Sequence, residues 1–396
     1  MILAALSFLP LAVWAYLLVG RGWFWRCGER DAAAAAASEA RSPDAPGAWP
    51  NVVAVIPARD EADSIGQSVG SLLRQDYPGR FSIVVVDDQS SDGTAAVASA
   101  AASAASGADR LQVVTGSDVP PGWTGKLWAM RQGLAVVEAD AEPPEFVLFS
   151  DADIAYAPHM LRRLVAIARS KDSVLTSVMV KLRCESLAER WLAPAFIFFF
   201  QMLYPFAWVN DPRRGAAAAA GGCMLARRSA LGLAGGLDAL RSALIDDCAL
   251  AALMKRRGAI WLGLTEDAHS LRAYPAFADF GRMVARSAFA ELRYSPLRLI
   301  GAVAGMALVY VAPPLFALAA HGVARWAGEL AWATMALSLA PTLRLYARPL
   351  TGGFVLPAIA VAYLVFTLQS AAQYWRGRGG YWKGRFQASI GEAGGA

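Results

Sequence analysis

The stretch Phe146-Val147-Leu148-Phe149-Ser150-Asp151-Ala152-Asp153 decides the fold, because it places two carboxylates directly after a short apolar run. Four apolar residues between Pro143-Pro144 and an acidic segment are typical of a buried strand in a parallel sheet. In open α/β sheets, ligands bind at the carboxyl ends of such strands. Side chains at i and i+2 of an extended segment point the same way, so Asp151 and Asp153 could share a divalent cation with substrate phosphates. The alternatives are a solvated acidic turn, or an Asp153 that caps the helix expected near Pro158.

Apolar strand patterns alternate with helical patterns upstream of this stretch. Strands are expected over residues 52–56, 81–86 and 111–114, and helices over 64–73, 94–105 and 125–137. The alternation indicates βαβ units, and hence an α/β fold with a mostly parallel sheet and flanking helices. A dinucleotide-binding Rossmann domain would need a Gly-x-Gly-x-x-Gly turn after the first strand. This chain has Pro57-Ala58-Arg59-Asp60-Glu61 there, with no glycine, which argues against that class.

The composition indicates membrane-embedded segments. Of the 396 residues, 56% are hydrophobic and 17% are charged, which is unusually apolar for a soluble enzyme. Residues 2–19 form an uncharged run of about the length that crosses a bilayer, and Arg21, Trp23, Trp25 and Arg26 follow it as a basic aromatic belt. A cleaved signal peptide is the alternative, but the run lacks a basic region before it and a small-residue cleavage site after it. We therefore expect an uncleaved anchor over residues 1–22.

The C-terminal third is a second apolar block, with runs at residues 299–320, 332–340 and 354–374. The first and last are expected to span the membrane. The middle run is shorter and either spans or re-enters, and we favour two crossings plus a re-entrant segment. The basic, aromatic tail then lies at the cytoplasmic face. The expected organisation is a 1–22 anchor, a 31–50 linker, a 51–295 catalytic domain with an apolar segment at 191–209, a 298–375 membrane region of two or three helices, and a 376–396 tail.

Charge and cysteine content exclude some classes of function. The net charge of +5 is modest, and no basic stripe with interleaved aromatic residues indicates a nucleic-acid partner. The four cysteines have neither paired nor metal-ligand spacing, which fits a reducing compartment. The three histidines are scattered, so neither a zinc site nor a Ser-His-Asp triad can be assembled from the sequence.

An ordered series of motifs between residues 50 and 295 resembles the family 2 glycosyltransferases, which have the GT-A fold. The series is Val-Ile-Pro-Ala-Arg-Asp-Glu at 55–61, Val-Val-Val-Asp-Asp-Gln-Ser-Ser-Asp-Gly-Thr at 84–94, Ser-Asp-Ala-Asp at 150–153, Gly-Gly-Cys-Met-Leu-Ala-Arg-Arg at 221–228, Gly-Gly at 235–236 and Leu-Ile-Asp-Asp at 244–247. The segments 122–128 and 198–206 are closer still to the hopene-associated glycosyltransferases (HpnB), which are similar to ceramide glucosyltransferases.

The resemblance implies a membrane-bound, inverting glycosyltransferase. It would move a sugar from a UDP-linked nucleotide sugar to a lipid acceptor, a hopanoid in the HpnB branch, with help from Mg²⁺ or Mn²⁺. It implies a multi-pass protein of the inner (plasma) membrane whose catalytic domain is cytoplasmic. One alternative is a processive polysaccharide synthase of the same fold, which would need more spans. Another is a non-catalytic scaffold that binds nucleotide sugars or lipid head groups, although gathering unused acids in one cleft would be costly.

In this family, acidic residues that follow the first two strands bind the nucleoside. The resemblance maps this role to Pro57, Asp60, Glu61, Asp87 and Asp88. Carboxylates suit the task because they can accept hydrogen bonds from ribose hydroxyls or from a uracil N–H. The alternative for Asp87 and Asp88 is capping of the next helix.

The diphosphate is expected to meet Lys126, Asp151 and Asp153. Lys126 lies at a predicted helix start, where its ammonium and the helix N-terminus could both face phosphate. Asp151 and Asp153 would hold the metal that neutralises the leaving group. An exposed lysine on a solvated helix face is the alternative for Lys126.

The general base is assigned to Asp247, with a supporting role for Asp246, because the family usually has Glu-Asp at this place. A base must lie within hydrogen-bond reach of the acceptor hydroxyl. Asp-Asp before the apolar run 248–255 is also a good helix-cap signature, and the two roles can coexist.

Acceptor or phosphate contacts are expected from Arg286, Arg293 and Tyr294. The family often has Gln-x-x-Arg-Trp here, whereas this chain lacks the glutamine and has tyrosine in place of tryptophan. The apolar segment at 191–209 lies between acid motifs that must share one side of the membrane. We therefore expect an interfacial helix facing a lipid acceptor, and a buried core helix is the alternative.

Overall fold

The computed structural model describes residues 2–41, 49–380 and 383–384, and within these residues the chain forms two compact units. The sheet unit comprises residues 29–183 and 208–273. The helical unit comprises residues up to 28, residues 184–207 and residues from 274 onward. Every acid motif of the sequence lies in the sheet unit.

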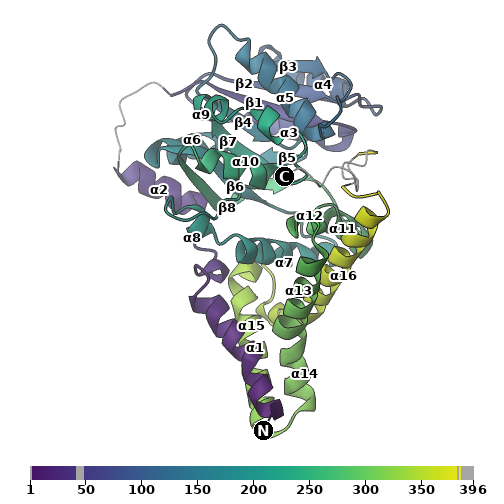
Figure 1. The fold of residues 1–396 in the computed structure, drawn as a ribbon. Helices are drawn as coiled ribbons and strands as arrows, with labels where there is room; N and C mark the ends of the chain where they lie inside the picture. Colours follow the sequence, from purple (N-terminus) through teal and green to yellow (C-terminus); the bar gives the residue numbers. More distant parts are fainter. Residues whose placement is uncertain (1, 42–48, 381–382, 385–396) are drawn as a thin grey trace. The chain divides into compact units, whose positions relative to one another are not determined.

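The sheet unit is built on eight strands in the order β3-β2-β1-β4-β7-β6-β8-β5 (Figure 1). Neighbours in β3-β2-β1-β4 run parallel, as do β6 and β8, whereas β7 runs antiparallel to β4 and β6, and β5 antiparallel to β8. The predicted mostly parallel α/β sheet is confirmed. The strands are β1 (Val52–Ala58), β2 (Phe81–Asp87), β3 (Leu111–Thr115), β4 (Phe146–Ser150), β5 (Ile154–Tyr156), β6 (Ser173–Lys181), β7 (Cys223–Arg227) and β8 (Ala259–Ser270).

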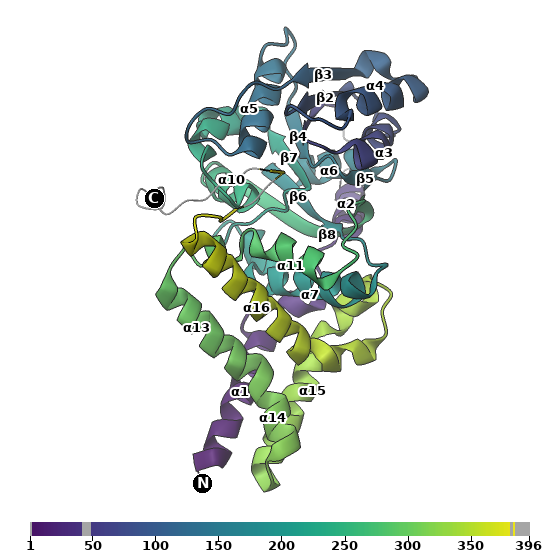
Figure 2. The same ribbon diagram turned by 90° about the vertical axis from the view of Figure 1, so that its right-hand side faces the viewer.

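Helices cover both faces of this sheet (Figure 2). On one face, the apolar sides of α3 and α4 share a buried core with alternate residues of β1 and β2, and α6 packs on β6. On the other face, α5 packs on β1 and β2, and α10 packs on β6 and β8. Because both faces are covered, β1 is buried along its whole length, which explains its continuous apolar run. The helices are α2 (Asp31–Arg41), α3 (Ala62–Leu73), α4 (Thr94–Ala104), α5 (Gly125–Glu138), α6 (Met160–Ser170), α9 (Arg228–Leu233) and α10 (Asp246–Lys255), with α8 (Phe206–Val209) at the border between the units.

The linker predicted over residues 31–50 is a helix in its first part, α2. Asp31 is buried at the start of α2, and its carboxylate accepts hydrogen bonds from Arg163 Nη1 at 2.8 Å and Thr265 Oγ1 at 2.9 Å. An alanine-rich composition favours helix as readily as it fits a linker, and these contacts with distant residues decide between them. Residues 42–48 of the predicted linker lie outside the described residues.

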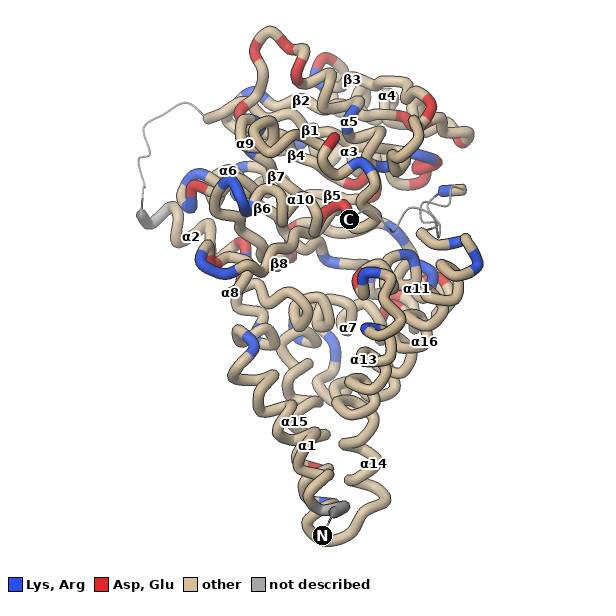
Figure 3. Tube along the Cα trace, viewed as in Figure 1, with Lys and Arg blue, Asp and Glu red and all other residues tan. Residues whose placement is uncertain are grey.

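The helical unit contains the apolar runs of both ends of the chain. Two of its segments, Pro296–Ala319 and Leu350–Trp375, are long and apolar enough to cross a bilayer, and they correspond to the first and last C-terminal runs. The apolar helices α1, α14 and α16 carry no charged residue (Figure 3). The helices are α1 (Ile2–Val19), α7 (Leu187–Leu203), α11 (Phe277–Ala285), α12 (Ala288–Glu291), α13 (Pro296–Met306), α14 (Ala312–Ala319), α15 (Gly322–Leu345) and α16 (Leu356–Trp375).

The middle C-terminal run was predicted to span the membrane or to re-enter it. It lies within α15, a continuous helix of 24 residues. Its N-terminal part is held close to α14 at Gly328, where a Cβ atom would lie 2.5 Å from the backbone nitrogen of Ala317. Whether this run crosses the bilayer or re-enters it stays a prediction. The number of crossings stays a prediction, and most of the 376–396 tail lies outside the described residues.

The apolar segment predicted at 191–209 forms most of α7, followed by α8. A capping box of Ser186 and Glu189 starts α7, and its residues Leu192 and Phe198 are buried within the helical unit. Much of α7 is therefore packed, as in the core-helix alternative, while Leu187 and Leu203 at its ends stay exposed. Its placement at a membrane interface stays a prediction. The four cysteines form no disulfide with one another in this structure.

We expect Gly133→Ala to lower the thermal stability of the full chain. A Cβ atom at Gly133 in α5 would lie 2.5 Å from Val55 Cγ1 on β1, so α5 would have to move off the sheet. Overpacking of this kind typically costs about 1–3 kcal/mol. Differential scanning fluorimetry of the chain in detergent measures the shift. Gly232→Ala is the matched control, because Gly232 lies in α9 and a Cβ atom there would have no neighbouring atom within 4 Å. Equal melting temperatures for the two variants would contradict the close packing of α5.

Candidate active site

The acid motifs meet because the strands that carry them are neighbours and run in the same direction. In the parallel pair of β1 and β2, Ala58 is in register with Asp87, so the residues after both strands leave the sheet at one edge. The other neighbour of β1 is β4, which delivers Asp151 and Asp153 to the same edge. This is the edge at which open α/β sheets bind ligands.

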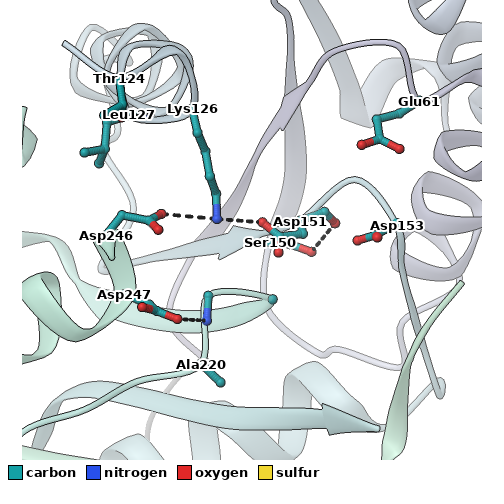
Figure 4. A network of polar contacts seen from close by, with 12 residues as sticks. Glu61, Thr124, Lys126, Leu127, Ser150, Asp151, Asp153, Ala220, Asp246 and Asp247 are labelled. Carbon is teal, nitrogen blue, oxygen red and sulfur yellow. Dashed lines mark hydrogen bonds and ion pairs between the residues drawn. The ribbon is translucent and has the colours of Figure 1, made fainter. Parts of the chain in front are cut away.

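Lys126 joins two of these acidic segments (Figure 4). Its Nζ lies 2.9 Å from Asp151 Oδ1 and 3.1 Å from Asp246 Oδ2. Lys126 is in the first turn of α5, which Thr124 caps by accepting a hydrogen bond from the Leu127 N–H. Asp246 is in the first turn of α10. The prediction of a helix start at Lys126 is confirmed, and the exposed-lysine alternative is excluded.

The charges of this group are balanced by their contacts. Burial by itself would lower the pKa of Lys126, but the carboxylates of Asp151 and Asp246 outweigh burial and raise that pKa above its usual value. Burial raises the pKa of Asp151, and the ammonium of Lys126 opposes this rise. Nearby Asp153 raises the pKa of Asp151 further, because a like charge close by disfavours ionisation of Asp151.

Asp247 lies beside this group and is held by the backbone. Its Oδ2 accepts a hydrogen bond from the Gly221 N–H at 2.9 Å, and its Oδ1 accepts one from the Cys248 N–H at 2.7 Å. Burial and the neighbouring charge of Asp246 raise the pKa of Asp247 to about 6, against the opposing effects of Lys126 and the two N–H groups. A Cβ atom at position 221 would lie 3.2 Å from Asp247 Oδ2, so glycine there permits the close approach. Asp247 thus stabilises the start of α10 and keeps a carboxylate that can take a proton near neutral pH.

Arg272 joins two further acids of the site, and the sequence did not indicate it. Its Nε lies 2.8 Å from Asp153 Oδ2, and its Nη2 donates a hydrogen bond to Glu61 Oε1. These contacts link the acids that follow β1 and β4 through a residue that follows β8. The sequence feature that could have indicated Arg272 is the apolar run at the start of β8. A strand predicted from this run would have placed Arg272 just beyond its end. Because the Asp153 carboxylate pairs with Arg272, it does not cap the following helix, which was the alternative considered for Asp153.

The remaining predicted nucleoside residues are held by contacts within and between the two loops that follow β1 and β2. Asp60 Oδ1 accepts a hydrogen bond from the Ser91 N–H at 2.8 Å, and Asp87 Oδ1 accepts one from the Ser90 N–H at 3.0 Å. Asp88 is fully buried, and Arg59 Nη1 donates to its backbone oxygen at 2.6 Å.

Two expectations about this region are corrected by the structure. The capping alternative for Asp87 and Asp88 fails, because Asp92 accepts the Thr94 N–H at the start of α4. The strand predicted to stop at proline continues through Pro57, which is buried and in register with Val86. The proline is tolerated because β1 ends one residue later.

Arg286, Arg293 and Tyr294 belong to the helical unit. Arg286 ends α11 and is exposed, and Arg293 and Tyr294 both have left-handed backbone conformations, with φ of 52° and 54°. Tyr294 stacks on Tyr374 with ring centroids 4.4 Å apart. Their role toward an acceptor or phosphate stays a prediction.

The carboxylates of Asp151 and Asp153 fit a metal that is completed by its substrate. Among the described residues, no group of three or more His, Cys, Asp or Glu side chains is arranged to hold a metal. Mg²⁺ commonly uses one or two protein carboxylates together with phosphate oxygens, and Asp153 lies close enough to Asp151 to raise its pKa. Their oxygen donors suit Mg²⁺ or Mn²⁺ bound with a diphosphate.

Comparisons with known proteins agree with this arrangement. The family described as glycosyltransferase-like family 2 matches residues 50–262. An N-acetylglucosaminyltransferase of Mesorhizobium japonicum is 28% identical over 185 residues, which cover 46% of this chain and 41% of that relative, so the match spans less than half of its length. The structure of mannosyltransferase PcManGT from Pyrobaculum calidifontis, in complex with GDP-Man and Mn²⁺, has a TM-score of 0.52 at 18% identity, covering 92% of this chain and 99% of that one. Mannosyl-3-phosphoglycerate synthase from Rubrobacter xylanophilus has a TM-score of 0.41 at 20% identity, covering 68% and 82%. The family match over residues 50–262 confirms the expected GT-A fold.

Lys126→Met should make the stability of the chain depend on pH. Removing the ammonium leaves the carboxylates of Asp151 and Asp246 without their cation. Breaking a buried ion pair by removing one partner typically costs about 3 kcal/mol or more. Without Lys126, the rise that burial causes in the pKa of Asp151 is no longer opposed by the ammonium. The variant should therefore lose stability as the pH rises above about 4 and regain it on acidification.

Melting temperatures of the full chain at pH 5 and pH 8 check this expectation. Lys171→Met is the matched control, because Lys171 is exposed at the end of α6. A Lys126→Met variant whose melting temperature differs from wild type by the same amount at both pH values would refute the pairing.

Proposed function

Because this chain belongs to glycosyltransferase-like family 2, and is therefore a glycosyltransferase, we propose that it is membrane-bound and transfers a sugar with inversion from a UDP-linked donor to a lipid alcohol. A hopanoid is the acceptor that we propose, because segments 122–128 and 198–206 resemble the hopene-associated branch. The enzyme would be a multi-pass protein of the inner membrane with its sheet unit in the cytoplasm.

The observation that carries the proposal is the ion-pair network around Lys126. One ammonium lies within 3.1 Å of carboxylates from two segments that are far apart in the chain, at the edge where the parallel strands end. Transfer from a nucleotide sugar creates negative charge on the leaving diphosphate. A cation at the start of a helix is well placed to meet that charge, since the helix N-terminus also favours anions.

The donor site is proposed from the residues around this cation. Asp60, Glu61, Asp87 and Asp88 would hold the nucleoside, with Pro57 shaping the end of β1, and Lys126 would face the diphosphate. A divalent cation bound to Asp153 and Asp151 would neutralise charge on the leaving group, and the Pyrobaculum calidifontis mannosyltransferase structure contains Mn²⁺ with its donor.

Asp247 is the residue we propose as general base, with Asp246 in support. A base works best when its pKa lies near the working pH, and the pKa of Asp247 is raised to about 6. Asp246 contributes to that rise through its own charge, while its contact with Lys126 keeps it in place. The Gly221 N–H holds Asp247 in a single orientation.

The membrane part of the proposal is supported by the helical unit. Its segments Pro296–Ala319 and Leu350–Trp375 have the length and composition of spans. Large apolar side chains on the first of them are exposed, including Leu297, Leu315 and Leu318. Such a surface is unfavourable in water and is expected where lipid covers it. Arg286, Arg293 and Tyr294, which follow α11 and α12, are proposed to contact the acceptor or phosphate.

Asp247→Asn should abolish transfer and leave donor binding nearly unchanged. Loss of a general base lowers the rate by about 10²–10⁴-fold. In the wild-type chain the rate should fall as the pH drops through about 6, because the base must be ionised and its pKa is about 6. Rates over pH 5–8, with UDP titration calorimetry in the presence of Mn²⁺, measure both effects. Asp238→Asn, at an exposed acid of the same unit, serves as the control. Retained turnover in Asp247→Asn would assign the base elsewhere.

The acceptor is tested by incubating the full chain in vesicles with radiolabelled UDP-sugars and a hopanoid alcohol, followed by solvent extraction. The proposal expects one labelled, lipid-extractable product that depends on both the alcohol and Asp247. Label that stays in solvent-insoluble polymer would instead favour a processive polysaccharide synthase. Absence of labelled lipid with every donor would refute a lipid acceptor.

A further inference from the structure

We propose that Arg272 makes binding of the divalent cation depend on the donor diphosphate. In the absence of the donor, its guanidinium pairs with Asp153 and disfavours a second cation there. When the donor binds, the guanidinium turns to the phosphate oxygens and leaves Asp153 to the metal. This inference rests on the proposed function, because it assumes that the site takes a nucleoside diphosphate.

The geometry places Arg272 at the carboxylate that the metal would use. Arg272 Nε is 2.8 Å from Asp153 Oδ2, a distance typical of a charge-assisted hydrogen bond. The same guanidinium donates to Glu61 Oε1 through Nη2. A single arginine therefore neutralises acids from two of the strand ends that form the donor site.

Burial indicates which partner can move. The side chains of Asp153 and Glu61 are 11% and 14% exposed, whereas that of Arg272 is 36% exposed. The backbone beside it is anchored, because the Leu271 N–H donates to the backbone oxygen of Asp153 at 2.7 Å. Rotation of the arginine side chain alone can thus redirect its charge while the two acids stay in place.

Lys126 differs from Arg272 in a way that makes the two cations complementary. Lys126 is held between two carboxylates and its side chain is only 18% exposed. It is a fixed positive charge for the diphosphate. Arg272 has five N–H donors in a planar fork, which matches phosphate as well as carboxylate oxygens. It can therefore exchange a carboxylate for a phosphate without losing its hydrogen bonds.

The test compares Mn²⁺ affinity of the full chain in detergent with and without saturating UDP, measured by electron paramagnetic resonance. Arg272→Gln should bind Mn²⁺ alone about tenfold more tightly than wild type, because a positive charge a few ångströms from the metal is removed. UDP should strengthen Mn²⁺ binding less in the variant than in wild type. Arg272→Lys retains the charge and should bind Mn²⁺ alone nearly as weakly as wild type.

Arg227→Gln is the matched control. Arg227 also contacts two carboxylates of the sheet unit, Glu145 and Asp172, but lies on β7 away from the strand ends that carry the acid motifs. Its loss should leave both Mn²⁺ affinities unchanged. Melting temperatures of all variants show whether each is folded.

The outcomes separate this inference from the proposed function. If UDP strengthens Mn²⁺ binding in wild type, but Arg272→Gln binds Mn²⁺ alone no more tightly than wild type, the role of Arg272 is refuted and the donor proposal stands. If Arg272→Lys behaves like Arg272→Gln, the charge is not the cause and the inference is likewise refuted. If UDP has no effect on Mn²⁺ affinity in wild type, the proposed donor fails, and the dependence assigned to Arg272 fails with it.

Discussion

The site depends on the placement of positive charge among carboxylates that would otherwise repel one another. Parallel strands bring the acids after β1, β2 and β4 to one edge, and the first turn of α10 adds two more. Such a cluster of like charges would destabilise the fold if it were left without cations. Lys126 and Arg272 each lie between acids from different segments, and this makes the cluster compatible with a folded chain.

Close packing of the backbone supports these charges. Gly133 lets α5 approach the sheet, and α5 in turn carries Lys126 to the strand ends. Because residue 221 is glycine, its N–H can reach Asp247. A Cβ atom at this position would lie only 3.4 Å from Lys126 Nζ. The site therefore depends on small residues at contact points as well as on the charged residues themselves. A change at either glycine would move a charged group without altering any charge.

The two units differ in how much apolar surface they leave exposed. The sheet unit covers both faces of its sheet with helices and keeps its charges at one edge. The helical unit leaves large apolar side chains exposed along α13, α14 and α16, which water would disfavour and lipid would accept. This contrast appears in the sequence as blocks of different composition. For that reason the apolar helices could be predicted from the sequence. The middle apolar run lies within the helix α15, whose contact with α14 at Gly328 could not be read from apolar length along the chain.

The sequence by itself determined the strands β1 to β4, the helices α3, α4 and α5 between them, the helix α10, the acids at their ends and the apolar helices. These features follow from local periodicity and from residues that stand next to strand ends, which are properties of neighbouring positions. Only the tertiary structure decided which charges pair. Arg272 lies 119 residues from Asp153 and 211 from Glu61 in the chain, and a pattern of nearby residues carries no information about such contacts. The same reason applies to the helix α2, whose Asp31 is held by Arg163 from 132 positions away, and to Lys126, whose environment is set by Asp151 and Asp246 together. Electrostatic pairing acts through space, so it becomes defined only when the sheet has brought distant segments to one edge.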